Sequence, residues 1–286
     1  MKKILITGAS GFVGSFLVEE ALSRGLEVYA GVRATSSRKY LQDERIHFFE
    51  MDFSKEEVLR QQLSATSFEY VIHCAGVTKA DSKAEFFKYN FELTKTFVSV
   101  LQEVMPRLEK FIYVSSLASY GPADNHPGEQ VVETDTPHPI DTYGESKLAT
   151  EQWLQGQANF PYLIFRPTAV YGPREAEIFI FFKTFTKGIE GHIGREQQKA
   201  TFIYVKDLAR LLLDATLSEH QQKAYFVSEG KHYPTQELGK IARKVLKKNP
   251  LKIRIPIGIV QVIAGFNEGF GRLTGKMPPL LSLIHI

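Results

Sequence analysis

Three residues in the middle of the chain could together move a proton to or from a carbonyl or alcohol oxygen. Tyr143 and Lys147 are four residues apart in a segment, 141–157, whose pattern predicts a helix, so their side chains share one face. A tyrosine phenol has a reference pKa near 10, and a lysine ammonium with an oxidised nicotinamide nearby would favour the phenolate. Tyr143 could then act as the acid or base. Ser116, which follows a predicted strand at 111–114, would hydrogen-bond the same oxygen, and Lys147 would also hold the nicotinamide ribose.

A tyrosine and a lysine at this spacing also occur on solvated helix faces, so the pair needs support from elsewhere. That support begins at the N-terminus, where an apolar run at 4–7 leads into three glycines spaced G-x-x-G-x-x-G. A strand, a tight turn and a helix start are predicted there. Gly8 permits an unusual φ, Gly11 lets a pyrophosphate approach the backbone, and Gly14 lets the helix press on the strand. The anion would sit at the helix N-terminus, beside Phe12 and Val13. A structural turn that binds nothing is the alternative.

The end of the second predicted strand, 26–32, bears on the choice of dinucleotide. Sites of this kind place an acidic residue there to hold the adenosine ribose hydroxyls. This chain instead has Arg33, with Arg38 and Lys39 close behind. Because a planar guanidinium can form two parallel hydrogen bonds to a 2′-phosphate, we expect NADP(H) to be preferred over NAD(H). The alternative is a solvated basic loop.

Two further strand ends supply candidates for the cofactor site. After the strand at 46–51, Asp52 could accept from the adenine amino group and Phe53 could flank the ring, although Asp52 could equally cap the next helix. After the strand at 70–74, small residues would let the backbone lie against a cofactor. The candidates there are Cys74, Ala75 and Gly76.

The order of elements predicts the fold class. Six predicted strands alternate with helices, which is typical of an α/β protein with a doubly wound parallel sheet. His73 lies within a strand and is expected to be packed or hydrogen-bonded rather than catalytic. Asn90 is the polar exception on the apolar face of a long helix at 83–105 and is expected to bond a backbone group or a water.

Composition and charge narrow the class of protein. The 286 residues carry a formal net charge of +3, which does not suggest a nucleic-acid surface. The single cysteine excludes an intrachain disulfide and a cysteine-based metal cage, and no metal site is expected. No signal peptide is recognisable, and no run approaches the roughly 18 apolar residues of a membrane span. We expect a cytoplasmic protein with a small-molecule substrate and no nucleic-acid or membrane partner.

Taken in chain order, these motifs resemble the extended short-chain dehydrogenase/reductase superfamily, in its NAD-dependent epimerase/dehydratase group. The matching stretches are 6–14, 73–76, 114–121, 143–147, 165–173 and 202–208. The resemblance implies a Rossmann fold, an active triad of Ser116, Tyr143 and Lys147, and a homodimer formed through the helices at 83–105 and 141–157. It also implies a dinucleotide site lined by Gly8, Gly11, Phe12, Gly14, Arg33, Asp52, Phe53, Ala75, Tyr143, Lys147, Pro167 and Val170.

The same resemblance implies two regions. Residues 1–173, with 201–228 returning to them, would form the NAD(P)-binding Rossmann domain. Residues 174–200 and 229–286 would form a smaller substrate-binding annex. A phenylalanine-rich segment at 178–185 is expected to pack the core of that annex, in preference to forming a binding patch.

Two residues after Ser116 depart from the sugar-nucleotide enzymes of the group. Dehydratases carry an acidic pair where this chain has Leu117 and Ala118, which disfavours a 4,6-dehydratase. Galactose epimerases carry a hydroxyl in place of Ala118. We therefore expect an NAD(P)-dependent oxidoreductase acting on a ketone or secondary alcohol, similar to dihydroflavonol reductases and 3β-hydroxysteroid dehydrogenases. A nucleotide-sugar epimerase or reductase with retained NAD is one alternative, and a non-catalytic NADP(H)-sensing protein is another.

Overall fold

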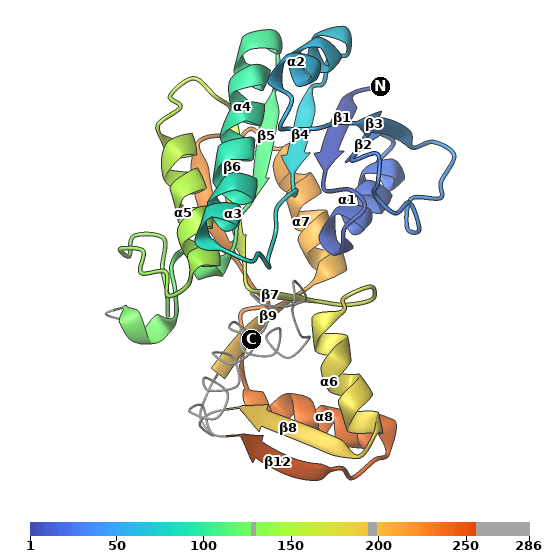
Figure 1. Cartoon of the computed structure of the whole chain (residues 1–286), viewed down its shortest axis with the longest axis vertical. Coiled ribbons are helices and arrows are strands. Elements are labelled where there is room, and N and C mark those ends of the chain that lie inside the picture. The colour runs from blue at the N-terminus through green and yellow to red at the C-terminus, as the bar shows by residue number, and fades with distance from the viewer. Residues whose placement is uncertain (127–129, 194–198, 256–286) are drawn as a thin grey trace. The chain divides into compact units, whose positions relative to one another are not determined.

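Seven parallel strands form the sheet at the centre of residues 1–170 and 203–228, one of the two compact units of the chain. A computed structural model describes residues 1–126, 130–193 and 199–255 (Figure 1). The strands are β1 (Lys3–Thr7), β2 (Glu27–Val32), β3 (His47–Glu50), β4 (Tyr70–His73), β5 (Lys110–Val114), β6 (Tyr162–Pro167) and β10 (Lys223–Val227). Their spatial order, β10-β6-β5-β4-β1-β2-β3, is the doubly wound Rossmann order with one strand added beside β6. The predicted fold class is confirmed.

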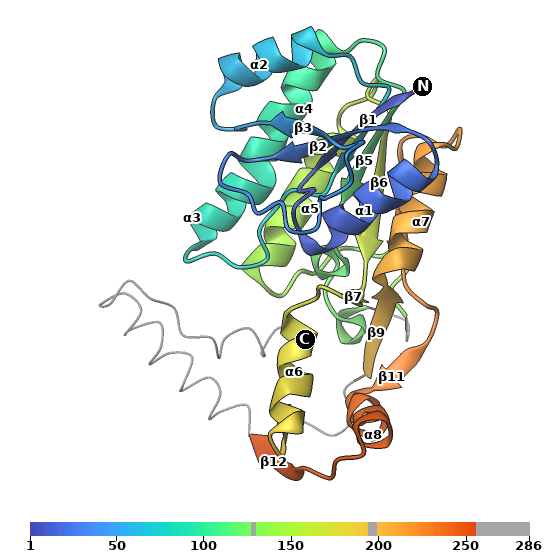
Figure 2. The same cartoon turned by 90° about the vertical axis from the view of Figure 1, so that its right-hand side faces the viewer.

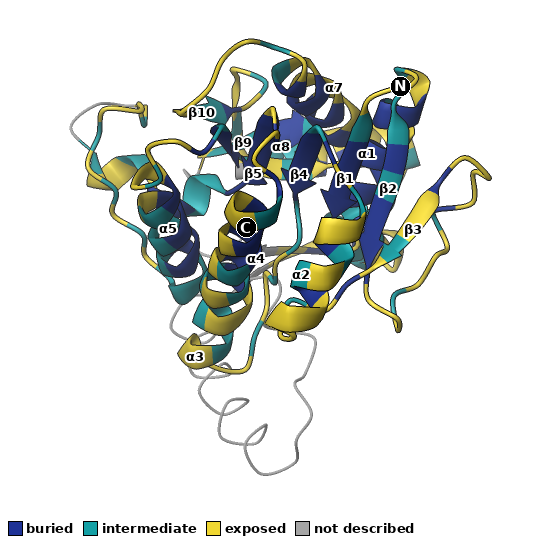
Figure 3. Cartoon of the chain, turned by 90° about the horizontal axis from the view of Figure 1, so that it is seen from above, coloured by how far each residue is buried: buried dark blue, intermediate teal, exposed yellow. Residues whose placement is uncertain are grey.

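Helices cover both faces of this sheet (Figure 2). One face carries α1 (Phe12–Ser23) and α7 (Val205–Thr216), and the other carries α2 (Glu56–Ala65), α4 (Leu93–Val104) and α5 (Thr142–Gln155). Since both faces are covered, the inner strands β1, β2, β4, β5 and β6 are mostly buried, which is why their sequences are almost continuously apolar. The edge strand β3 is largely exposed (Figure 3).

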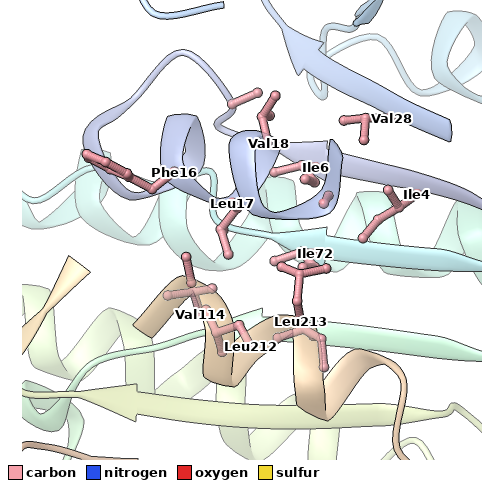
Figure 4. Packing of buried hydrophobic residues seen from close by; sticks show 14 of the residues in the cluster. Ile4, Ile6, Phe16, Leu17, Val18, Val28, Ile72, Val114, Leu212 and Leu213 are labelled. Carbon is pink, nitrogen blue, oxygen red and sulfur yellow. The ribbon is translucent and has the colours of Figure 1, made fainter. Parts of the chain in front are cut away.

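Two apolar clusters fill the space between the sheet and its helices. In the first, Ile4 and Ile6 of β1 pack with Leu17 of α1 and with Leu212 and Leu213 of α7 (Figure 4). The second lies on the other side of the sheet and joins β4 and β5 to α2, α4 and α5. The sheet is thereby held rigidly from both sides, and its strand ends are fixed relative to one another.

The long helix predicted at 83–105 is present but is not uniformly α-helical. It consists of α3 (Lys83–Phe86), a π-helical segment (Phe87–Glu92) and α4. Asn90 lies within the π-helical segment and is only 1% exposed. A π-helical turn inside an α-helix often marks a functional position, and the widened turn here contains the polar residue that interrupts the apolar face.

The second unit comprises residues 171–202 and 229–286, of which 194–198 and 256–286 lie outside the described residues. The strands β7 (Ala169–Tyr171) and β9 (Lys199–Tyr204) carry the chain between the units. The other elements are α6 (Glu177–Thr186), β8 (Ile189–Ile193), β11 (His232–Pro234), α8 (Thr235–Leu246) and β12 (Leu251–Ile255). β12 pairs in parallel with β8. That this unit binds substrate stays a prediction.

The phenylalanine-rich segment forms α6, and its aromatic rings do not all have the same environment. Phe181 lies 5.5 Å from Phe182 and 5.8 Å from Phe185, centroid to centroid, and Phe185 is fully buried. Phe179 is 61% exposed. The expected core packing therefore holds for Phe185 and its neighbours and not for Phe179. Among the described residues, no helix is long and apolar enough to cross a membrane.

The turn between β1 and α1 generates a prediction about stability. A Cβ added at Gly14 would lie 2.1 Å from the carbonyl oxygen of Gly8, so Gly14→Ala must push α1 away from the sheet. We expect the free energy of unfolding to fall by about 2 kcal/mol or more in a urea titration. Gly191→Ala is the matched control, because a Cβ there meets nothing within 4 Å. Equal losses in the two variants would contradict the prediction.

Candidate active site

The predicted site residues lie at the edge of the sheet where the parallel strands end. The turn after β1 holds Gly8, Gly11, Phe12, Val13 and Gly14; Arg33 follows β2; Asp52 and Phe53 follow β3; Cys74, Ala75 and Gly76 follow β4; Ser116 follows β5; Pro167 ends β6; Val170 lies in β7; and Tyr143 and Lys147 lie on α5. In open α/β sheets this edge is where ligands bind. No group of three or more His, Cys, Asp or Glu able to hold a metal is found in the part of the chain that the structure describes.

The glycine turn has the geometry that the sequence predicts. Gly8 has a φ of +68°, and a Cβ there would meet the backbone of Ala75 at 2.8 Å. Gly14 lies against the carbonyl of Gly8, whereas a Cβ on Gly11 would have only that oxygen, at 3.2 Å, within 4 Å. The first turn of α1 has no acidic residue. An exposed helix N-terminus with a glycine at its cap fits the diphosphate of a dinucleotide.

His73 is a structural residue, as predicted. Its Nδ1 lies 2.8 Å from the hydroxyl of Thr7 and its Nε2 lies 2.9 Å from the hydroxyl of Thr94. Burial lowers the pKa of His73 to about 3, so the ring is neutral at physiological pH. The Thr7 hydroxyl also accepts a hydrogen bond from the backbone N–H of Ala75, at 3.2 Å. His73 thus joins the ends of β1 and β4 to α4.

Asn90 also bonds a backbone, as predicted. Its amide oxygen accepts from the N–H of Val77 at 2.8 Å, and its amide nitrogen donates to the carbonyl of Val77 at 3.0 Å and to Ser146 at 3.0 Å. A Cβ added at Gly76 would lie 3.0 Å from the Asn90 oxygen. The segment after β4 is therefore held between the π-helical segment and α5, and Gly76 packs closely against the Asn90 side chain.

Ser116, Tyr143 and Lys147 come together at this edge. Asp141 caps α5 by accepting from the N–H of Gly144 at 2.7 Å, which starts the helix just before Tyr143. The Ser116 hydroxyl lies near enough to the Tyr143 phenol to oppose part of the rise in its pKa, and it accepts the backbone N–H of Ala118 at 3.2 Å. The Lys147 ammonium donates to the carbonyl of Val114 at 3.0 Å and lies 6.0 Å from the centre of the Tyr143 ring. Two of its protons remain for a ligand such as ribose hydroxyls.

The pKa of Tyr143 differs from the expected lowering. Burial raises it to about 12, and the Ser116 hydroxyl opposes part of this rise. Lys147 is only 5% exposed, and burial lowers the pKa of its own ammonium to about 8. Desolvation is thus the largest influence on the pKa of the phenol. The chain's own residues leave the phenol protonated, and a further positive charge is needed to favour the phenolate.

The basic residues after β2 differ in their surroundings. Arg38 donates to Glu50 at 2.8 Å and its guanidinium lies 4.2 Å from the centre of the Phe48 ring. Arg33 is exposed, and within the described residues its guanidinium has no partner. Its backbone N–H donates to the hydroxyl of Ser36 at 3.0 Å, which folds the loop back on itself. Arg33 is therefore the available cation at the end of β2.

The residues after β3 make contacts within the protein. Asp52 accepts from both the backbone N–H and the hydroxyl of Ser54, at 3.0 and 2.6 Å, and these bonds lower its pKa. Phe53 packs 5.7 Å from His73 and 5.0 Å from Phe97, centroid to centroid. Lys55, not Asp52, is the cap residue of α2. The predicted contacts of Asp52 and Phe53 with adenine stay predictions.

Two functional candidates were missed from the sequence. Glu151 on α5 and Arg166 on β6 form an ion pair of 2.7 Å, and each is at most 2% exposed. A charged residue within an otherwise apolar strand was the available signal, because an arginine buried there requires a partner. The sequence alone did not say which residue the partner was.

The family model described as NAD dependent epimerase/dehydratase family matches residues 4–227. The chain belongs to this family. A sterol-4-alpha-carboxylate 3-dehydrogenase (decarboxylating) of Dictyostelium discoideum is 27% identical over 186 residues, which are 61% of this chain and 55% of that protein. A UDP-glucose 4-epimerase of Vibrio cholerae is 28% identical over 96% of this chain and 83% of its own length.

A solved structure agrees with the fold. The UDP-glucose 4-epimerase of Thermus thermophilus, solved in complex with NAD, superposes with a TM-score of 0.78 at 26% identity, over 89% of this chain and 86% of that one. The chain spans only about half the length of the sterol dehydrogenase. The activity, substrate and partners of the whole protein are therefore matters of proposal.

The burial of Lys147 predicts how stability varies with pH. Because its pKa is lowered from 10.5 to about 8 on folding, the unfolded chain binds more protons between these two values. The cost of burying the ammonium, about 3 kcal/mol, is present in full below pH 8 and disappears as the pH rises towards 10.5. Replacing it also removes the bond to Val114, worth about 1 kcal/mol.

We therefore expect Lys147→Met to increase the free energy of unfolding by about 2 kcal/mol at pH 7, with the gain shrinking above pH 8. Urea titrations at pH 7 and 9.5 measure this. Lys88→Met, at an exposed position of the π-helical segment, is the control. A loss of stability in Lys147→Met at pH 7 would refute the argument.

Proposed function

We propose that this protein is an NAD(P)-dependent oxidoreductase that transfers a hydride between the nicotinamide and a ketone or secondary alcohol. The observation that carries the proposal is the meeting of Ser116, Tyr143 and Lys147 at the same sheet edge as the glycine turn. A proton donor, a hydrogen-bond donor for the substrate oxygen and a buried cation beside an anion-binding helix terminus match this reaction.

Each residue of the triad has one role. When bound, the dinucleotide supplies the hydride donor or acceptor and, in its oxidised form, a positive charge. Tyr143 donates its proton to the carbonyl oxygen during reduction and removes one from the alcohol during oxidation. Ser116 hydrogen-bonds the same oxygen and orients it. Lys147, held by Val114, uses its remaining protons on the ribose hydroxyls and favours the phenolate of Tyr143.

We also propose that NADP(H) is preferred over NAD(H). The support is Arg33, exposed at the end of β2 where an acidic residue would hold the ribose of NAD. Glu50, the acidic residue at the end of β3, is paired with Arg38. A 2′-phosphate would therefore meet an available guanidinium rather than a carboxylate.

A nucleotide-sugar epimerase with retained NAD is the second candidate. Its support is the Vibrio cholerae UDP-glucose 4-epimerase, which matches 96% of this chain. Ala118 counts against it, because the residue has no hydroxyl. Both candidates use the same Tyr143 chemistry and differ in whether the dinucleotide leaves after each turnover.

Three further features are proposed with this function. Residues 174–200 and 229–286 contribute the substrate pocket. The helices at 83–105 and 141–157 form the interface of a homodimer. The protein acts in the cytoplasm on a small molecule.

The role of Tyr143 is tested by Tyr143→Phe. A screen of ketones, secondary alcohols and UDP-sugars identifies a turnover, and the variant should lower kcat by about 100-fold or more because the proton donor is gone. Its dinucleotide dissociation constant should stay within about threefold, because the glycine turn is intact. Tyr89→Phe, at an exposed tyrosine on the π-helical segment, should retain full activity. Full turnover by Tyr143→Phe would remove the catalytic assignment.

The dinucleotide preference is tested by fluorescence titration with NADPH and NADH. Arg33→Ala should weaken NADPH binding by about 10-fold or more, on the basis of about 1.5 to 3 kcal/mol for a charge-assisted hydrogen bond. NADH binding should be unchanged. Arg45→Ala, which removes an exposed cation paired with Asp43, is the control. Purified protein that retains NAD and binds NADH as tightly as NADPH would favour the epimerase.

A further inference from the structure

Four polar side chains of the first unit meet in a buried group that the proposed reaction does not use. We call the group of Ser115, Ser119, Glu151 and Arg166 the Glu151 cluster. Its members are at most 4% exposed, although they come from the end of β5, the turn after it, α5 and β6. Buried polar groups favour arrangements that give their donors and acceptors partners. Within the described residues, Nη1 of Arg166 is the one buried polar side-chain atom of this cluster that has none.

The carboxylate of Glu151 has partners on both of its oxygens. Oε1 accepts from the hydroxyls of Ser115 and Ser119, the latter at 2.8 Å. Oε2 accepts from Nε of Arg166 at 2.8 Å and pairs with Nη2 at 2.7 Å. A carboxylate has about four acceptor sites, so all of them are occupied. The group cannot turn without breaking one of these bonds.

Arg166 makes this arrangement possible in a dry environment. A buried carboxylate without a cation would be strongly destabilising. The guanidinium of Arg166 neutralises it and packs against two adjoining aromatic rings, 4.3 Å from the centre of Tyr120 and 5.1 Å from that of Phe226. The plane of the guanidinium, and with it the carboxylate, is therefore fixed by packing.

The cluster holds the chain on both sides of Ser116. Before it, Ser115 donates its hydroxyl to Glu151 and its backbone N–H to the carbonyl of Phe165, at 2.7 Å. After it, the Ser119 hydroxyl lies 2.8 Å from Glu151 and 2.8 Å from the carbonyl of Ser116, so its one proton is shared between them. The backbone N–H of Ser119 also donates to that carbonyl, at 3.1 Å.

Glu151 lies on the same helix as the other two residues of the triad. It follows Tyr143 by eight positions and Lys147 by four in α5. The helix that carries the phenol and the ammonium therefore also carries the carboxylate that bonds Ser115 and Ser119, which lie before and after Ser116 in the chain.

We propose that the Glu151 cluster is a positioning device, which ties the segment carrying Ser116 to α5 and so sets the contact between the hydroxyls of Ser116 and Tyr143. Glu151, Ser115, Ser119 and Arg166 are positioning residues and do not touch the substrate. The inference rests on the proposed function in treating Ser116 and Tyr143 as the reacting pair. The competing explanation is that the cluster contributes only to stability.

Nuclear magnetic resonance distinguishes the two without requiring turnover. In protein labelled with ¹³C at the ζ carbon of tyrosine, the Tyr143 resonance is assigned by its loss in Tyr143→Phe. Ser116→Ala should shift this resonance, because the polar hydroxyl that lowers the pKa of the phenol is lost. The double variant Ser115→Ala/Ser119→Ala, which keeps the Glu151–Arg166 pair, should shift it in the same direction.

The decisive comparison adds the double variant to Ser116→Ala. If the cluster acts through Ser116, the two extra substitutions should not move the Tyr143 resonance further, since the hydroxyl that they position is already absent. Thr216→Val is the matched control: it removes a buried hydroxyl on α7 whose bond, to the carbonyl of Leu212, stays within its own helix. It should leave the resonance in place. If the double variant does not fold, Ser119→Ala alone should give part of the shift.

Three results would overturn the proposal: no shift in the serine variants while Ser116→Ala shifts the resonance, equal shifts with and without the Ser116 hydroxyl, or no shift in Ser116→Ala itself. Once a substrate is found, the double variant should lower kcat by about 10- to 100-fold. KM and the dinucleotide dissociation constant should change less than twofold. Absence of any turnover with the predicted resonance shifts would count against the function and leave the positioning intact.

Discussion

The close approach of α1 to the turn after β1 is the constraint on which the site depends. Gly14 lies against the carbonyl of Gly8, and Gly8 in turn lies against the backbone after β4. These contacts leave no room for a side chain, so they fix the helix terminus relative to two central strands at once. Because the strands are parallel and buried on both faces, their ends meet at one edge. The positions of Arg33, Ser116 and α5 follow from that edge.

Burial at this edge shifts the pKa values of two side chains, and for Lys147 it lowers the stability of the folded protein. Lys147 is held as an ammonium that burial disfavours, and Tyr143 has a phenol that burial keeps protonated. Two shifted pKa values at the edge of the sheet that also holds the glycine turn are typical of a catalytic site. The Glu151–Arg166 pair is a second buried charge at the same place, and its cost is offset by complete hydrogen bonding of the carboxylate.

The family assignment does not by itself identify the substrate or the reaction. The matched region, residues 4–227, contains the sheet, the glycine turn and the triad. Relatives that share this region include a sterol dehydrogenase and UDP-glucose 4-epimerases. Proteins named for very different substrates thus resemble this chain. A shared fold is compatible with many reactions, so the substrate has to be inferred from the groups at the site and not from the family alone.

The sequence by itself determined the fold class, the glycine turn, the packed state of His73 and the meeting of Ser116, Tyr143 and Lys147 at one edge. These depend on periodicity and on strand order, which are local patterns or follow from general rules of topology. Tertiary structure alone decided the rest. The rise in the pKa of Tyr143 by desolvation could not be read from residue spacing, because burial depends on what packs around a residue. The partner of Arg166 was likewise not predictable. A buried charge in a sequence indicates that a partner exists but not which residue it is.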